Sequence, residues 1–363
     1  MSGRHLLLAL HRYVGVSAGL LLVLIGLTGS LLVFRDEIDE VLNPTLLRVA
    51  PREEFVPLQA VLNDVLRSYP HDRPVAIRLP RSAEGVYEIW MNGEEGLRVY
   101  IDPYTGEIRG SRFPIQTFTG FLFLAHAQLL GGEIGETIVG VGAFLLLGLG
   151  VTGIVLWWPG GKRLWQGFTV PWRAPVARVA YDLHRVVGIV AIAVLAVIAI
   201  TGACLTFHSA VSSGMTWLTG APLHPAPPVS PPPAGESGGP PRHSPVALDT
   251  ILQHADQALP GAVTTWISLP RAFGEAVVVR KKFAEEIHPH GRSFVHLDQQ
   301  SGRVLLIDHA LQAPLATRID NLLYPLHIGR VGGFGARLLY LLIGLAPAVL
   351  FLTGLLMWRS EKS

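Results

Sequence analysis

Four long apolar runs dominate the hydrophobic pattern of this chain. They cover about residues 13–34, 138–158, 186–207 and 338–358, and none of them contains Asp, Glu, Lys or Arg. A helix needs about 20 apolar residues to cross a bilayer, so each run predicts a transmembrane helix. The first run leads into acidic residues and has no clear small-x-small cleavage site, so we interpret it as a retained helix and not as a signal peptide.

The segment between the first two runs has the pattern of a small α+β module. Apolar residues recur at helical spacing over 57–69, which predicts an amphipathic helix. Stretches rich in β-branched and aromatic residues predict strands at 75–79, 86–91 and 97–101. The sequence Asp-Pro-Tyr-Thr-Gly at 102–106 predicts a turn, because Pro sets the first dihedral angle and Gly tolerates positive φ.

The segment between the third and fourth runs repeats this plan. A helix is expected at 248–259 and strands at 264–269, 275–280 and 293–297, with a turn at 298–302. A stretch dense in Pro, Gly and Ser precedes the module and predicts a semi-extended linker without a core of its own.

Each half of the chain therefore consists of a span, an outer α+β module and a second span. The expected fold class is an integral membrane, mainly α protein, with four transmembrane helices in two parallel repeats and two small α+β modules outside the membrane. Such repeats are related by an axis along the membrane normal. The expected boundaries are 1–35, 36–116, 117–160, 161–183, 184–212, 213–245, 246–312 and 313–363.

Composition and charge agree with a multi-pass membrane protein. Half of the residues are hydrophobic and only 15% are charged, against about a quarter in soluble domains. Lys and Arg gather in the short segments, which places both termini in the cytoplasm and both modules outside. These residues are Arg4, Arg12, Lys162, Arg163, Arg173, Arg178, Arg359 and Lys362. No basic stripe with interleaved aromatic residues is present, so nucleic acid is not an expected partner.

Four histidines occupy matched positions in the two halves. The sequence Leu-His-Arg surrounds both His11 and His184, and a Thr-Gly pair follows each of these histidines by 17 positions. His126 and His327 each precede another Thr-Gly pair by 26 positions. Ionisable residues near lipid are costly and are commonly functional.

Matched histidines at membrane edges predict paired axial ligands for haem, and therefore electron transfer. Seventeen helical residues rise about 25 Å, so one pair, His11 with His184, lies at one depth and the other, His126 with His327, lies at another. Two haems, one near each face, are the simplest arrangement. His208 is a rival ligand on the outer side, although its counterpart in the first half is Arg35.

Other readings of these residues stay open. Each histidine could instead be a polar cap at the membrane interface, and the Thr-Gly pairs could serve close helix packing. Arg12 and Arg185 could pair with haem propionates or with lipid phosphates. His288-Pro289-His290 could bind a metal or form a solvated loop.

Several classes of chemistry lack their sequence motifs. The chain has no Walker loop, no HExxH and no nucleophile elbow, and no GxGxxG follows a strand. Its one cysteine, Cys204, excludes an intrachain disulfide and covalent c-type haem attachment. We therefore name no catalytic side chain and expect electrons to come from an unidentified cytoplasmic or membrane donor.

These motifs resemble those of the PepSY-associated transmembrane helix family, and within it the siderophore-iron reductases of the bacterial inner membrane. The resemblance rests on the two Leu-His-Arg…Gly motifs with their Thr-Gly pairs, on the turn at 102–106, and on Gly153 to Pro159, and it covers nearly the whole chain. It implies two PepSY-like modules in the periplasm. The second module departs from the pattern, because its turn at 298–302 lacks Pro and Tyr.

The resemblance also implies a function. The chain would hold two haem b groups and carry electrons outward across the bilayer, as a ferric-siderophore reductase. It would reduce ferric siderophore in the periplasm and release Fe(II). The alternative is a non-redox, membrane-anchored PepSY protein with an interaction or regulatory role.

Overall fold

The computed structural model describes residues 3–93, 96–159, 161–229, 246–272 and 274–360. Most of the predicted Pro/Gly-rich linker, residues 230–245, lies outside the described residues, as does Lys362. The chain divides into two compact units, each built from separate stretches of sequence. A helical unit contains Met1–Arg35, Phe121–Ser213 and Leu323–Ser363, and a sheet unit contains Asp36–Gly120 and Gly214–Leu322.

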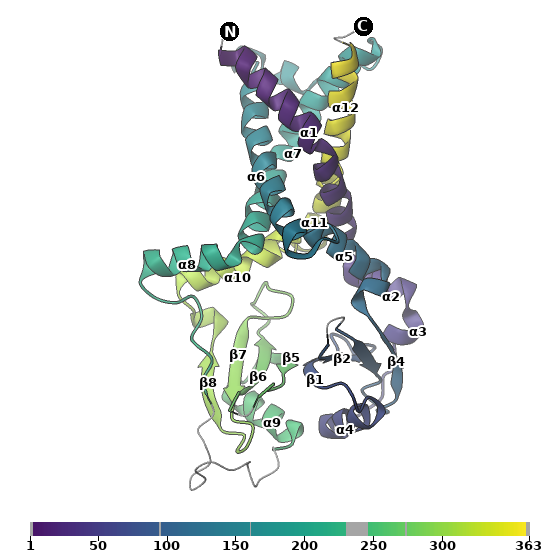
Figure 1. The fold of residues 1–363 in the computed structure, drawn as a ribbon, viewed down its shortest axis with the longest axis vertical. Coiled ribbons are helices and arrows are strands. Elements are labelled where there is room, and N and C mark those ends of the chain that lie inside the picture. The colour runs from purple at the N-terminus through teal and green to yellow at the C-terminus, as the bar shows by residue number, and fades with distance from the viewer. Residues whose placement is uncertain (1–2, 94–95, 160, 230–245, 273, 361–363) are drawn as a thin grey trace. The chain divides into compact units, whose positions relative to one another are not determined.

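The helical unit contains four helices that are long and apolar enough to cross a membrane, which confirms the four predicted spans. They are α1 (Gly3–Leu32), α6 (Gly132–Trp157), α7 (Val176–Thr206) and the pair α11 (Gly333–Ile343) with α12 (Ala346–Ser360) (Figure 1). Both α1 and α7 pack against α6 and against α12. As a result, α1 and α7 face each other across the bundle.

The fourth span is interrupted between α11 and α12, although its apolar run is continuous. Pro347 lies at the second position of α12, where it offers no N–H and its ring excludes the carbonyl of Ile343. The interruption is also a close crossing point with α1. A Cβ atom on Gly26 would lie 2.6 Å from the Gly344 carbonyl oxygen, and Ser30 donates a hydrogen bond to the Leu341 carbonyl at 3.0 Å.

Shorter helices connect the spans to the sheet unit, and the 3₁₀ turn η2 (Gly161–Phe168) joins α6 to α7. Two of them, α5 (Phe118–Gln128) and α10 (Leu315–His327), carry a histidine in their last turn. The others are α2 (Arg35–Leu42), α3 (Pro44–Leu47) and α8 (His208–Thr219), with 3₁₀ turns η1 (Pro114–Gln116) and η3 (Ala310–Gln312).

The sheet unit is built on one antiparallel sheet of eight strands in the order β4-β3-β2-β1-β5-β6-β7-β8 (Figure 1). The first module supplies α4 (Leu58–Ser68), β1 (Pro74–Arg78), β2 (Tyr87–Met91), β3 (Arg98–Ile101) and β4 (Ile108–Arg112). The second supplies α9 (Leu248–Ala258), β5 (Val263–Ser268), β6 (Val277–Lys282), β7 (Ser293–Leu297) and β8 (Val304–Asp308).

The two modules share this sheet through β1 and β5, which the sequence did not predict. Ile77 of β1 lies opposite Ile267 of β5, and both side chains are fully buried. One core therefore runs through both modules, formed by the apolar face of the sheet and the apolar faces of α4 and α9. The other face carries polar and aromatic side chains.

Most predicted elements of the modules are present within one to three residues, but β4 and β8 were missed. β4 has the sequence Ile-Arg-Gly-Ser-Arg, which lacks an apolar alternation, and both strands form outer edges of the sheet. Both predicted turns are present. Gly106 and Gly302 have positive φ of 75° and 68°, and each donates its N–H to the Asp carbonyl four residues earlier.

Candidate functional site

The structure brings His11 and His184 together inside the helical unit. His11 lies on α1 and His184 on α7, the two helices that face each other across the bundle. Their ring centroids are 6.2 Å apart and their ring planes are inclined by 80°. Both side chains are half-buried.

A second pair forms between His126 and His327, at the ends of α5 and α10. Their ring centroids are 6.1 Å apart and their planes are inclined by 50°. Both side chains are again half-buried. The four matched histidines therefore form two pairs.

These separations fit two imidazoles that share one metal ion. A metal–imidazole bond is about 2.0–2.1 Å long and a ring centre lies roughly 1.1 Å behind its nitrogen, so two rings facing one ion have centroids about 6.3 Å apart. The observed separations of 6.2 and 6.1 Å agree with this value.

Each histidine contacts a threonine through Nδ1, and the four threonines are those of the repeated Thr-Gly pairs. The pairing is reciprocal within each half, because the threonine that follows one histidine in the sequence contacts the other histidine of that half. The Nδ1–Oγ1 distances are 2.7 Å for His11–Thr152, 3.2 Å for His126–Thr28, 3.0 Å for His184–Thr353 and 3.1 Å for His327–Thr201.

These contacts determine which ring nitrogen carries the proton. Each threonine hydroxyl donates to the carbonyl four residues earlier on its helix, as Thr152 does to Gly148 at 2.8 Å. Its oxygen is then left to accept from the histidine Nδ1–H. Three of the Nδ1 atoms also lie 3.0–3.1 Å from a backbone carbonyl, which can only accept. The Nε2 lone pair is therefore left for a ligand.

The glycine of each Thr-Gly pair lies against the histidine ring that its threonine contacts. A Cβ atom would lie 2.8 Å from His126 at Gly29 and 3.0 Å from His327 at Gly202. The fit at the other pair is looser, because a Cβ atom would lie 3.5 Å from His11 at Gly153 and 3.8 Å from His184 at Gly354. Each Thr-Gly pair thus supplies one acceptor and one space for an imidazole.

The two histidine pairs lie at different depths along the bundle. On α1, His11 belongs to one pair, and Thr28, 17 positions later, contacts the other. At about 1.5 Å per residue this separation is about 25 Å, close to the thickness of the apolar core of a bilayer.

In a comparison with protein families, the model of the PepSY-associated TM region matches residues 8–360. The chain belongs to this family. A comparison with curated proteins finds no relative. In this PepSY-associated protein the family match covers the four spans, the sheet unit and both histidine pairs.

His208, the third outer candidate, has a different setting from His126 and His327. It is exposed and is the first residue of α8, whereas His126 and His327 face each other. The geometry therefore favours the His126–His327 pair over any pair that includes His208.

A charged group lies next to His184 on α7. Asp182, which is 1% exposed, forms ion pairs with Arg178 at 2.6 Å and with Arg185 at 3.1 Å. Arg185 also donates to the Gln166 carbonyl at 2.7 Å, but its Nε atom is buried and has no hydrogen-bond partner among the described residues. Arg185 follows His184 directly in the sequence, and a guanidinium N–H without a partner suits a carboxylate such as a porphyrin propionate.

The donor set also fits a porphyrin better than a metal ion held by protein alone. No cluster of three or more His, Cys, Asp or Glu residues suited to a metal ion occurs in the described part of the chain. Structural metal sites made from side chains usually need four ligands, whereas haem iron takes only axial ligands from the protein. Two isolated imidazole pairs match the second requirement.

Sequence reasoning missed the threonines and glycines as parts of the site. It assigned them to helix packing, because small residues are common where membrane helices cross. The signal was nevertheless present in the constant spacings of 17 and 26 positions, which join each Thr-Gly pair to a histidine of the neighbouring site.

Proposed function

We propose that this protein is a transmembrane dihaem b electron-transfer protein that reduces ferric siderophore in the periplasm and releases Fe(II). His11 and His184 would hold one haem, and His126 and His327 the other. The observation that carries the proposal is the pair of sites in which two imidazoles have a metal-sharing separation and each Nδ1 is engaged by a Thr-Gly pair.

The side chains of the chain orient and tune the ligands. Each threonine oxygen holds an Nδ1–H, fixes the rotation of the ring and raises the basicity of Nε2. When bound, haem supplies a one-electron Fe(III)/Fe(II) couple. The half-buried setting of the rings limits access of water to the iron and helps to set its potential.

The direction of transfer follows from the charge distribution. Basic residues in the short segments favour cytoplasmic termini in the bacterial inner membrane, with the two modules in the periplasm. Two parallel repeats, each carrying one ligand for each haem, account for the matched spacings. Electrons would then enter near His11 and His184 from an unidentified donor and leave near His126 and His327.

The substrate chemistry is consistent with this direction. Siderophores hold Fe(III) through hard oxygen donors, and Fe(II) binds such donors more weakly, so one electron loosens the metal. Ferric siderophore is the electron acceptor in this scheme, and the chain needs no side chain as nucleophile or general base.

Haem content of the purified full-length protein tests the cofactor. We expect a Soret band, split α and β bands on reduction, and two haems per chain in a pyridine haemochrome assay. Replacing His11 or His184 with Ala lowers this content by about one haem and leaves the other. His208→Ala is the matched control and keeps both. A colourless preparation from haem-replete cells would instead favour the non-redox PepSY interaction protein.

A second measurement tests the acceptor. Protein reduced with dithionite and freed from excess reductant is mixed with ferric siderophore, and Fe(II) is trapped with a coloured chelator. We expect Fe(II) to form with the wild type but not with His327→Ala. Unchanged reoxidation kinetics in the variant would remove His327 from the electron path.

A further inference from the structure

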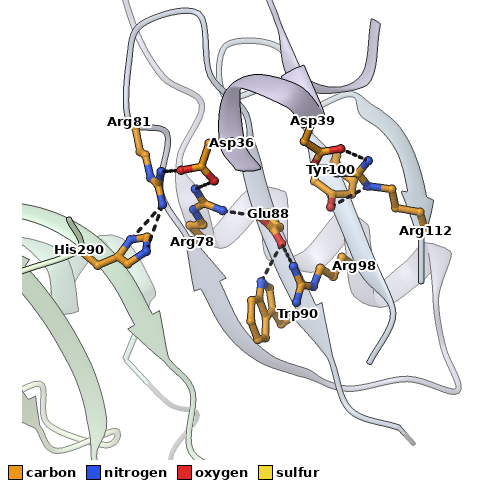
Figure 2. Close-up of polar contacts among 10 residues, drawn as sticks. All are labelled: Asp36, Asp39, Arg78, Arg81, Glu88, Trp90, Arg98, Tyr100, Arg112 and His290. Atoms are coloured by element: carbon orange, nitrogen blue, oxygen red, sulfur yellow. Dashed lines mark hydrogen bonds and ion pairs between the residues drawn. The ribbon is translucent and has the colours of Figure 1, made fainter. Parts of the chain in front are cut away.

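A group of basic side chains gathers on the polar face of the sheet, where the two modules join. We name this group the seam cluster, and Figure 2 shows its first-module part together with His290. Its members come from β1 and the residues after it, from β6, and from the loop between β6 and β7. They are Arg78, Arg81, Arg280, His288, His290 and Arg292.

Contacts across the seam tie the two modules together at this place. Arg81, three residues after β1, lies 3.1 Å from Nε2 of His290 in the second module (Figure 2). Arg280 on β6 lies 3.2 Å from Nδ1 of His288, and it also donates to the Gly291 carbonyl at 2.8 Å. The strand pairing of β1 with β5 therefore brings together guanidinium groups from both modules.

Aromatic rings lie among these cations. Trp90 of β2 and Trp266 of β5 meet edge to face where the modules join, with ring centroids 4.7 Å apart. The guanidinium carbon of Arg98 lies 3.9 Å from the centre of the Trp90 ring. On the other side, Arg280 and Arg292 lie 5.6 and 5.7 Å from the same ring, Phe294. Two guanidinium groups at one ring repel each other unless an anion is near, and Asp320, which lies 3.8 Å from Arg292, supplies part of that negative charge.

In the first module, two carboxylates are shared among the guanidinium groups. Asp36 contacts both Arg78 and Arg81, and Glu88 contacts both Arg78 and Arg98. Arg98 keeps a buried Nε atom that has no hydrogen-bond partner in the described part of the chain. Three guanidinium groups, those of Arg78, Arg81 and Arg98, thus share two carboxylates at this end of the polar face.

The two histidines of the seam cluster argue against a bound cation. Their rings are 6.0 Å apart, which by itself would suit a metal. Burial, and then the charges of Arg280 and Arg292, lower the pKa of His288 to about 2. Burial, and then Arg81 and Arg78, lower the pKa of His290 to about 3. Burial is the larger cause of both shifts, and the guanidinium groups add positive charge that repels a metal cation and attracts an anion.

We propose that the seam cluster binds an anionic, aromatic iron(III) chelate, the catecholate class of ferric siderophore. Guanidinium groups attract the ligand oxygens of such a chelate, while Trp90, Trp266 and Phe294 offer faces and edges for its rings. Neutral or cationic hydroxamate chelates lack both features. The inference rests on the proposed function, since it assigns a substrate class to the same protein.

Binding can be tested without electron transfer by using gallium(III), which is redox-inert and has nearly the size of iron(III). The full-length protein, in nanodiscs of neutral lipid, is titrated by calorimetry with the gallium(III) complexes of a tricatecholate and of a trihydroxamate siderophore. We expect tighter binding of the catecholate. Arg81→Gln and Arg280→Gln should each weaken it about tenfold or more, as expected for loss of a charge-assisted hydrogen bond.

A matched control is Arg67→Gln on α4, whose side chain is 78% exposed and pairs with Asp64. It changes the net charge equally but lies on the helix that covers the opposite face, so binding should not change. Trp266→Leu keeps the net charge, and it should weaken binding of the catecholate complex without changing binding of the hydroxamate complex. Equal affinity for both chelates, or full affinity in both arginine variants, would overturn the proposal.

The same oxyanion chemistry could come from a lipid phosphate. The titration is therefore repeated in nanodiscs with anionic phosphatidylglycerol. Unchanged catecholate affinity supports the siderophore, whereas loss of catecholate binding by the wild type in phosphatidylglycerol identifies a headgroup site and overturns the proposal. Haem content and Fe(II) release from a hydroxamate chelate are measured in parallel. If these persist while the seam cluster fails to bind, only the substrate class is wrong.

Discussion

At the residue scale, the side chain needed at each position of the histidine sites follows from the hydrogen-bond donors and acceptors that it must supply. A threonine in a helix satisfies its own hydroxyl hydrogen by donating to the carbonyl four residues earlier, so its oxygen can accept from a neighbour. Serine could do the same, but valine could not. The hydroxyl of Thr152 thus sets the tautomer of His11, a residue 141 positions away in sequence.

Replacing Thr152 with Val tests this role. The change removes the acceptor 2.7 Å from Nδ1 of His11 and should make Nε2 a weaker base. A less basic ligand favours Fe(II), so the midpoint potential of one haem should rise. A hydrogen bond of about 1 kcal/mol corresponds to roughly 40 mV for one electron, which a spectroelectrochemical titration can resolve.

Two companion variants separate this effect from a change in packing. Thr152→Ser keeps the acceptor and should restore the potential. Thr137→Val alters a hydroxyl on the same helix, α6, that bonds only its own turn at Glu133 and should leave both potentials unchanged. A Thr152→Ser protein that behaves like Thr152→Val would show that the methyl packing, not the hydroxyl, is what matters.

At the element scale, the length of the apolar runs predicted the four spans. In lipid a backbone must satisfy its own hydrogen bonds, so a long apolar run forms a helix. Periodicity likewise found α4 and α9. It could not find β4, whose residues do not alternate, or the interruption at Pro347, which occurs within an apolar run. The histidine pairs could be inferred from repetition. Their reciprocal use of Thr-Gly pairs could not, since sequence spacing does not say which helices cross.

Helix approach at the histidine pairs can be tested with four equivalent substitutions. Gly29→Ala and Gly202→Ala place a Cβ atom 2.8 and 3.0 Å from the rings of His126 and His327, so a ring or a helix must move. Gly153→Ala and Gly354→Ala meet rings at 3.5 and 3.8 Å, which is ordinary van der Waals contact.

We expect the two pairs of variants to differ in haem content. The first two variants should lose about one of the two haems in a pyridine haemochrome assay, and the last two should keep both. Membrane levels of the four proteins, measured by immunoblot, report any general loss of folding. If all four variants kept or lost haem equally, the close fit at His126 and His327 would have no role in ligation.

At the scale of the whole molecule, the chain builds each unit from non-contiguous segments. The sequence predicts two modules of similar plan, and the structure contains both, but no feature of the sequence indicates that they share one sheet. Nothing in the sequence of β1 or β5 specifies its partner, because both are short strands that could equally form an edge. Their pairing makes one core and creates the seam, so the two modules should unfold together.

Val65→Ala tests this cooperativity. Val65 on α4 is fully buried in the first module, and losing two methyl groups should cost about 2 kcal/mol. Because Ile77 and Ile267 join the modules through strand pairing, hydrogen exchange measured by mass spectrometry should accelerate up to about 30-fold in β5 and β6 as well as in β1 and β2. Leu66→Ala, on the same helix but 41% exposed, should change little. Acceleration confined to the first module would mean that the β1–β5 pairing adds no stability, and the seam would then be a weak contact between two separate folds.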